Sequence, residues 1–295
     1  MTIETWLAGR MSKQEFVAHH YGRLPYSQGG GGDTLTQFGT WDFLGRVLAQ
    51  PNADVMVVRR NQQYTGPAPV SGDQAERLAS EGYTVLVRHA ERHDQRLAEL
   101  AAGFARDFAA PVNIHMYATP AEQFGFGWHY DCEEVFILQA SGFKEYSLRK
   151  NTVNPWPLEE TLPADMQYPR EIMPLVRCTL GPGDWLYIPC GYWHKAEAHE
   201  TAISLAVGVM APAAIEWVDR LRAELLDSLL WRQRLPVVGD AAVLDDRQLE
   251  ELFEQLAREL AADVTKRLTN PALWRRWMAE RRAEYGIADE PPGAP

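Results

Sequence analysis

The spacing of hydrophobic residues divides the chain into three stretches. In residues 1–50, Ser12 and Glu15 have the spacing of a helix-capping box ahead of the amphipathic segment FVAHHY. Thr40 precedes a second amphipathic segment, WDFLGRVLAQ, which ends at Pro51. The first stretch is therefore expected to form short helices joined by loops.

Between Ala53 and Met210 the pattern changes to short apolar runs that are rich in β-branched residues and separated by Gly, Pro, Asn and Asp. These runs predict strands, and their sequences are ADVMVV, GYTVLVRH, VNIHMYA, EVFILQ, KEYSL, WLYIP and AISLAVGVM. One segment, RHDQRLAELAAGFARDFAA, instead has helical spacing, with Asp94 as its cap. Many short strands with a single long helix predict a mainly β fold with added helices, an antiparallel sandwich or jelly roll rather than a parallel α/β sheet.

After Met210 the strand pattern disappears. Three segments with helical periodicity follow, IEWVDRLRAELLDSLLW, DDRQLEELFEQLARELAADVTKRL and PALWRRWMAERRAEYG. We expect a strand-rich domain over residues 1–210, a helical module over 211–286 and a disordered tail over 287–295.

Composition narrows the class of protein. The 295 residues are 46% hydrophobic, which is enough to bury a substantial core. Three cysteines without a C-x-x-C spacing indicate neither a disulfide framework nor a thiolate zinc site, and they favour a reducing compartment. Because there is no signal-peptide pattern and no run near the roughly 18 apolar residues of a membrane helix, we expect a cytoplasmic protein without a membrane partner. The net charge of -11 argues against a nucleic-acid partner, since phosphate binding needs clustered Lys and Arg.

Three polar residues have the spacing of a metal site. His129 and Asp131 lie two apart in GWHYDCEEVFILQ, so in an extended segment both side chains project from one face. His194 ends GPGDWLYIPCGYWH about sixty residues later, which leaves enough chain for strands that return it alongside. Two histidines and one carboxylate leave coordination positions open, as in non-haem Fe(II) oxygenases, whereas a closed structural zinc site has four ligands.

The segments FGWHYDCEEVFILQASGFKEYSL and LGPGDWLYIPCGYWHKAEA resemble the JmjC-type cupins that include the ribosomal oxygenases, and KQEFVAHHYGRLPY resembles their amino-terminal segment. The resemblance covers roughly residues 5–210. It implies a double-stranded β-helix core, Fe(II), 2-oxoglutarate as cosubstrate with O₂, and hydroxylation of a protein or peptide side chain. The helical segments after Met210 are similar in kind to the dimerisation modules of such enzymes, so a homodimer is expected.

The resemblance also implies residues that bind 2-oxoglutarate. The distal carboxylate of this cosubstrate requires a buried cation, and Lys144 lies where the family has a basic residue for this purpose. Tyr117 matches the family position whose hydroxyl reaches the same carboxylate, and Ser204 is a further candidate for the pocket. The alternative is that Lys144 extends to solvent and Tyr117 packs in the core. The family often has an amide residue where this chain has His115.

Residues close to the metal motif also have expected positions. Trp128 and Trp193 directly precede the first and last ligands, and they are expected either to wall the site or to pack in the core. Cys132 is expected to point to the opposite face from Asp131. The insert NTVNPWPLEETLPADMQYPREIMP, residues 151–174, is expected to line the substrate groove.

The sequence leaves three alternatives open. The first is a metal-dependent cupin of another reaction class, although three His and one Glu are the commoner ligands there. The second is a non-catalytic module that retains the fold, and the third is a lysine demethylase. The prime substrate is not specified, and a ribosomal protein, another protein, a precursor peptide and a small molecule all stay open.

Overall fold

The computed structural model describes residues 2–7, 9–30, 33–164, 168, 173–239 and 245–288. The chain forms two compact units, Met1–Ala211 and Pro212–Pro295. Each is described by itself. The catalytic and dimerisation roles expected for these parts of the chain stay predictions.

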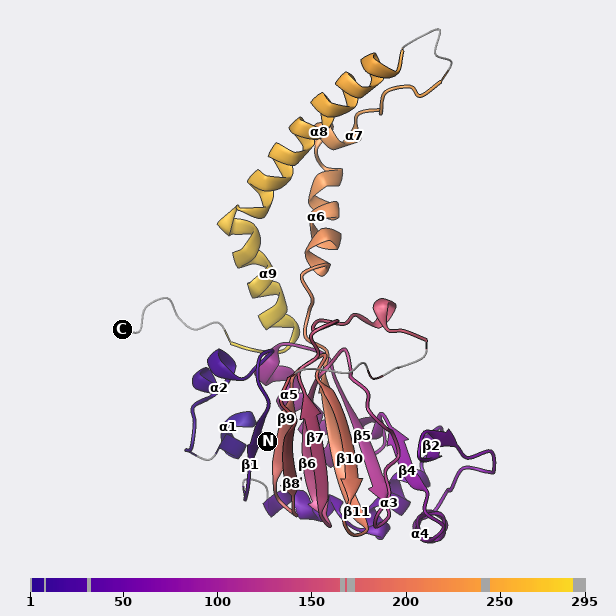
Figure 1. The fold of residues 1–295 in the computed structure, drawn as a ribbon. Coiled ribbons are helices and arrows are strands. Elements are labelled where there is room, and N and C mark those ends of the chain that lie inside the picture. Colours follow the sequence, from indigo (N-terminus) through magenta and orange to yellow (C-terminus); the bar gives the residue numbers. More distant parts are fainter. Residues whose placement is uncertain are drawn as a thin grey trace. The chain divides into compact units, whose positions relative to one another are not determined.

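The first unit is built from antiparallel strands (Figure 1). Their bounds are β1 (Tyr26–Gln28), β2 (Asp54–Arg59), β3 (Gln62–Gln63), β4 (Thr84–Arg88), β5 (Val112–Thr119), β6 (Glu134–Ser141), β7 (Lys144–Arg149), β8 (Val176–Leu180), β9 (Trp185–Ile188), β10 (Trp193–Ala198) and β11 (Ala202–Val209). Within the described ranges, one sheet has eight strands in the order β1-β9-β6-β11-β5-β4-β2-β3, and the other has three in the order β10-β7-β8. The mainly β, cupin-type fold expected from the sequence is confirmed.

The burial of β11 explains the position of the cavity. This strand lies between β5 and β6, and Leu205 pairs with Met116 on one side and Leu138 on the other. Successive side chains of a strand point to opposite faces. Leu205 and Val207 therefore pack in one hydrophobic core, while Ser204 lines a cavity on the other face.

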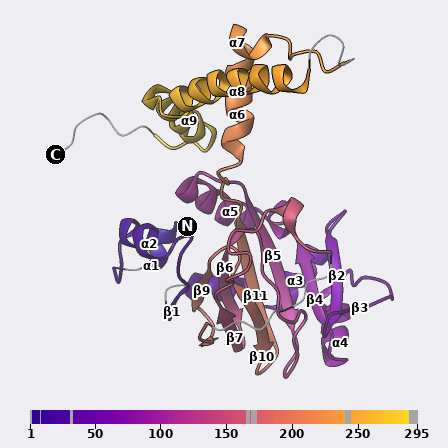
Figure 2. The ribbon, with the colours of Figure 1, turned by 45° about the horizontal axis from the view of Figure 1, so that its top comes forward.

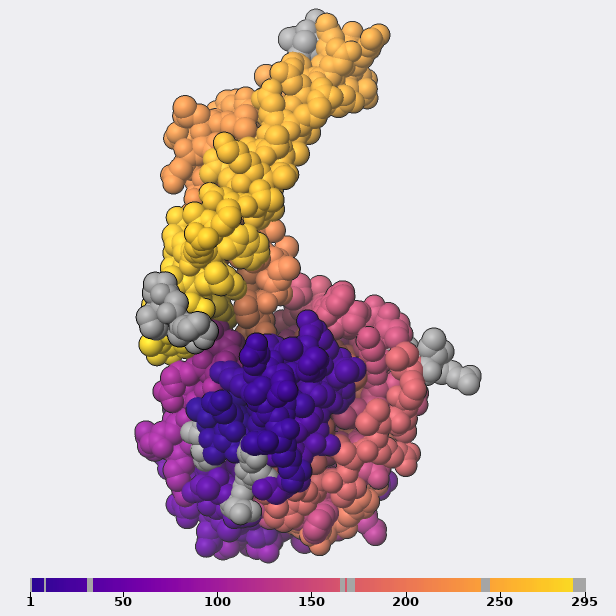
Figure 3. Space-filling view, turned by 90° about the vertical axis from the view of Figure 1, so that its left-hand side faces the viewer, coloured from indigo at the N-terminus to yellow at the C-terminus, as the bar shows by residue number. Residues whose placement is uncertain are grey.

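Helices cover the outer face of the larger sheet. The helices of this unit are α1 (Ile3–Leu7), α2 (Lys13–His19), η1 (Asp33–Phe38), α3 (Trp41–Leu48), α4 (Gly72–Ser80), η2 (Ala90–Arg92), α5 (Gln95–Phe108) and η3 (Glu159–Thr161). Trp6, Phe16 and Phe104 from three of these helices pack with Phe136 of β6 in one core. Figure 3 shows the N-terminal segment, in indigo, lying on the surface of this unit. A smaller core, which includes Ile137 and Tyr146, lies beside the cavity.

The expected helix caps are confirmed. Ser12 and Glu15 form a capping box at α2, and the side chains of Thr40 and Asp94 accept backbone N–H groups at α3 and α5. The sequence reading missed α4, which begins after its own cap, Ser71. That helix has nine residues and is mostly polar, and only Ala75, Leu78 and Ala79 are buried, so few apolar positions mark it in the sequence.

The second unit consists of helices (Figure 2). They are α6 (Glu216–Leu226), α7 (Leu229–Arg232), α8 (Asp246–Leu268) and α9 (Pro271–Glu284). Among the described residues of these four helices only Leu221 is buried, whereas Leu229 is 78% exposed. The expected tail falls mostly on residues 289–295, which lie outside the described residues, as do residues 240–244. No helix in the described part of the chain is long and apolar enough to span a membrane.

Candidate active site

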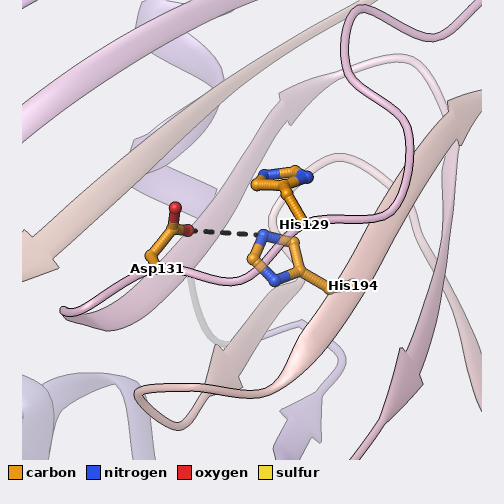
Figure 4. A group of neighbouring side chains, drawn as sticks. All are labelled: His129, Asp131 and His194. Atoms are coloured by element: carbon orange, nitrogen blue, oxygen red, sulfur yellow. Dashed lines mark ion pairs between the residues drawn. The ribbon is translucent and has the colours of Figure 1, made fainter. Parts of the chain in front are cut away.

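The structure brings His129, Asp131 and His194 together (Figure 4). One potential ligand atom from each side chain lies within 4.8 Å of the others. Nε2 of His194 is 3.4 Å from Oδ2 of Asp131, and the two imidazole centroids are 4.2 Å apart. This arrangement supplies two imidazoles and one carboxylate from one side, which is the donor set of a non-haem Fe(II) centre.

Backbone carbonyls orient both imidazoles. Nδ1 of His129 lies 2.8 Å from the carbonyl oxygen of Gly127, and Nδ1 of His194 lies 3.0 Å from that of Tyr192. A ring whose Nδ1–H is donated to a carbonyl leaves Nε2 free to bind a metal. Burial, with the neighbouring His129, lowers the pKa of His194. That ring is therefore held neutral, as metal ligation requires.

The loop that leads to His194 is fixed from β6. Glu134, the first residue of that strand, accepts hydrogen bonds from the hydroxyl of Tyr187 and, at 3.2 Å, from the backbone N–H of Cys190. The backbone N–H of Gly191 donates to the carbonyl of Asp131 at 2.9 Å. These contacts connect the two segments that carry the candidate ligands.

The H-x-D motif, considered above as an extended segment, precedes a strand and is not part of it. The backbone of His129 pairs with that of His194 in an isolated bridge, and β6 begins only at Glu134. Because the intervening residues are not in a strand, strict alternation of faces does not hold there. Cys132, expected on the opposite face from Asp131, lines the same cavity.

Neither tryptophan is among the residues that line the cavity, and only Trp193 is buried. Trp193 is 2% exposed and meets the ring of Tyr130 edge-on, with 4.6 Å between centroids. Trp128 stacks on Tyr168, also at 4.6 Å. Of the insert, Leu162 lines the cavity, while residues 165–167 and 169–172 lie outside the described residues. That the insert lines a substrate groove stays a prediction.

Lys144 occupies one end of a cavity of about 230 Å³ that also reaches the three candidate ligands. It is 4% exposed, so it does not extend to solvent. Its Nζ donates to Oγ of Ser204 at 3.2 Å and lies 5.6 Å from the ring centroid of Tyr117. Burial lowers the pKa of Lys144 to about 8, and no carboxylate in the described part of the chain pairs with it. A buried ammonium without a counterion is costly, and an anionic ligand would remove that cost.

Other lining residues were missed in the sequence. Tyr146, two residues after Lys144 on β7, is buried and lines the cavity together with Ser204. Asn113 and Glu133 line the cavity as well, and burial raises the pKa of Glu133. The two-residue alternation of β5 and β7 was the available signal, because it places Asn113 and Tyr146 on the same faces as residues already singled out.

His115 also lines the cavity, at the position where the resembling family often has an amide residue. Its Nδ1 accepts a hydrogen bond from the backbone N–H of His89 at 3.3 Å. Burial lowers the pKa of His115. The side chain is therefore a neutral ring that faces the cavity from β5 and is held by the residue that follows β4.

Comparison with known families decides the class of this fold. Residues 86–217 match the family model of the JmjC domain. This likeness to the JmjC domain extends over 132 of the 295 residues, a little under half of the chain. The matched range includes all six candidate site residues, His129, Asp131, His194, Lys144, Tyr117 and Ser204.

The curated relatives that this chain matches are longer than the chain. It is 32% identical over 210 residues to the bifunctional lysine-specific demethylase and histidyl-hydroxylase NO66 of Dictyostelium discoideum, which covers 62% of this chain and 40% of that protein. It is 26% identical to ribosomal oxygenase 1 of Gallus gallus, over 79% of this chain and 41% of that protein. The chain thus spans about two fifths of the length of these relatives.

Solved structures also support the fold described above for this chain. The ribosomal oxygenase YcfD of Escherichia coli, in complex with cobalt and 2-oxoglutarate, matches with a TM-score of 0.58 and 20% identity, over 92% of this chain and 71% of YcfD. A YcfD complex with cobalt and succinic acid matches with a TM-score of 0.53 and 19% identity, over 92% of this chain and 71% of that one. At this level of identity the likeness establishes the fold alone.

Proposed function

We propose that the JmjC-like domain is an Fe(II)- and 2-oxoglutarate-dependent oxygenase that hydroxylates a protein or peptide side chain, with formation of succinate and CO₂. The observation that carries the proposal is one cavity with the His129, Asp131 and His194 donor set at one end and the unpaired, buried Lys144 at the other. The two ends match a metal and a dicarboxylate respectively. A cupin of another reaction class would not require a buried cation opposite its metal.

Each residue has a role in this proposal. His129, Asp131 and His194 hold the iron, which together with 2-oxoglutarate and O₂ supplies the oxidising chemistry. Lys144 neutralises the distal carboxylate, Ser204 donates or accepts a hydrogen bond beside it, and Tyr117 supplies a hydroxyl to the same pocket. The apolar wall of the cavity excludes water.

The comparisons support this reading through the relatives' own properties. The Dictyostelium relative is named a histidyl-hydroxylase, and YcfD binds cobalt with 2-oxoglutarate. A protein substrate follows by analogy. We also propose a cytoplasmic location, with which the free cysteines Cys132, Cys178 and Cys190 agree.

Calorimetry tests the proposal. Titrating 2-oxoglutarate into protein loaded with Mn(II) under nitrogen is expected to give binding that disappears when the metal is omitted, because both ends of the ligand are needed for affinity. In air with Fe(II), a peptide substrate should gain one oxygen atom by mass spectrometry. Metal binding without any affinity for 2-oxoglutarate would favour another cupin reaction, and loss of a methyl group would favour demethylation.

The helical unit provides the surface for a proposed homodimer. The apolar residues Val218, Leu226 and Leu229 are more than half exposed there, and α8 and α9 have no buried residue in the described part of the chain. Helices of this length gain most of their stability from packing an apolar face. A second copy of the unit would cover these side chains.

Sedimentation measures this assembly. The protein is expected to sediment as a dimer at micromolar concentration, and the double variant Val218→Glu/Leu229→Glu as a monomer, since charges would enter an apolar interface. Val70→Glu is the matched control, because Val70 is 60% exposed in the other unit. A monomeric wild-type protein would end the dimer proposal.

A further inference from the structure

A pair of acceptor groups lies on the larger sheet, away from Lys144. Gly208 of β11 pairs in register with Asn113 of β5 on one side and Val135 of β6 on the other. Glu133 directly precedes β6, and its side chain lines the cavity with Asn113 and Gly208. Gly208 is four residues beyond Ser204, which corresponds to roughly 13 Å of strand. The pair therefore belongs to the opposite end of the cavity from the ammonium group.

The absence of a side chain at Gly208 makes room for this pair. Nδ2 of Asn113 donates to Oε1 of Glu133 at 2.7 Å. Oδ1 of Asn113 and Oε2 of Glu133 both occupy the space that a Cβ atom on residue 208 would need, Oδ1 at 2.6 Å and Oε2 closer still. Any other residue at position 208 would displace one or both oxygens.

Among the described residues, no side chain or backbone group donates a hydrogen bond to either oxygen. Oδ1 of Asn113 is buried and has no hydrogen-bond partner in the described part of the chain. No Lys or Arg of the described ranges pairs with Glu133, and the charged groups that act on it are the carboxylates of Asp131 and Glu159. A buried amide oxygen without a donor is costly, and Glu133 beside it is partly buried. A ligand with two N–H groups and positive charge would satisfy both oxygens.

We propose that Glu133 and Asn113 form a specificity subsite that binds a cationic, hydrogen-bond-donating side chain of the substrate. The ligand class is a guanidinium, ammonium or imidazolium group, held beside the three candidate metal ligands. This inference rests on the proposed oxygenase function and deepens it, because it assigns a charge to the residue that enters the cavity. Lys144 then selects the anionic cosubstrate, and Glu133 with Asn113 selects the cationic substrate.

Peptide pools test the subsite without relying on turnover. Each pool has randomised flanks and one fixed central residue, Arg, Lys, His, Gln or Leu. Retention of each pool by the 295-residue protein is measured by equilibrium dialysis with Mn(II) and 2-oxoglutarate under nitrogen. At least one cationic pool is expected to be retained about tenfold more than the Gln pool, because the charged hydrogen bonds are lost with Gln. The cationic pool with the highest retention identifies the cationic group that the subsite prefers.

Three variants separate the subsite from general charge. Glu133→Gln preserves size and should reduce the preference to less than about threefold, and Gly208→Ala should do the same by displacing both oxygens. Glu159→Gln removes an exposed neighbouring carboxylate and should keep the preference. A wild-type protein that retains the Gln pool equally, or a Glu133→Gln protein that keeps the full preference, overturns the subsite.

A parallel assay in air with Fe(II) separates this inference from the proposed function. Oxygen transfer to peptides without any preference for a cationic centre would overturn the subsite alone. A cationic preference in the dialysis, with neither 2-oxoglutarate binding nor oxygen transfer, would support the subsite and overturn the oxygenase function.

Discussion

The His194→Ala variant is expected to lose metal binding and to form succinate at least about a thousandfold more slowly than the wild-type protein. The substitution removes one of the two imidazoles in the cluster. His194 is only 7% exposed, so solvent is poorly placed to supply a replacement ligand. Metal content by elemental analysis and succinate formation with 2-oxoglutarate and Fe(II) measure the two effects.

His199→Ala is the matched control for this experiment. His199 is exposed and lies between β10 and β11, five residues from His194, so its loss should leave both measurements unchanged. A His194→Ala protein that keeps metal and turnover within tenfold of the wild type would remove His194 from the metal site.

The Lys144→Met variant is expected to have opposite effects on binding and on stability. Removing the cation should weaken 2-oxoglutarate binding at least about a hundredfold, because the buried distal carboxylate would lose its partner. The ligand-free protein should become more stable, by up to about 3 kcal/mol at pH 7, because burial lowers the pKa of Lys144 to about 8 from its ordinary 10.5. Calorimetry and chemical denaturation measure the two changes.

The pH dependence of stability gives a second check on Lys144. The folded pKa lies below the unfolded one, so the unfolded chain binds more protons between pH 8 and 10.5. The contribution of Lys144 to the free energy of unfolding should therefore rise across that window, and the advantage of Lys144→Met should shrink. Lys195→Met, on the neighbouring strand β10 and partly exposed, is the control. A less stable Lys144→Met protein at pH 7 would contradict the account of an unpaired buried charge.

Strands with apolar runs, and the strand with alternating apolar residues in KEYSL, were predictable from the sequence, whereas other polar or short strands were not. The run AISLAVGVM became β11, which is buried along its whole length. The strands β8 and β10 were missed as runs, because VRCTL and WHKAEA carry polar residues on a partly exposed sheet. Hydrophobic residues in a sequence mark buried positions. The partly exposed three-stranded sheet buries too few residues to give a clear apolar pattern.

At the candidate site, the spacing of residues in the sequence predicts some features and not others. The convergence of His129, Asp131 and His194 was expected from their types and spacing, but the backbone that presents the first two is not a strand. The burial of Lys144 could be expected only through the resemblance to a family. The Asn113 and Glu133 pair depends on the register of β5, β6 and β11, which long-range pairing decides and no local pattern encodes.

The central place of β11 has a consequence for how the protein is made. This strand is the last of its unit to leave the ribosome, yet it lies between β5 and β6 and completes the pairing of both. Until residue 209 emerges, each of those two strands has an open edge, which is a surface prone to pairing with other chains. The larger sheet must therefore close late in synthesis, and slow elongation or an early stop before β11 should favour aggregation over a partly folded barrel.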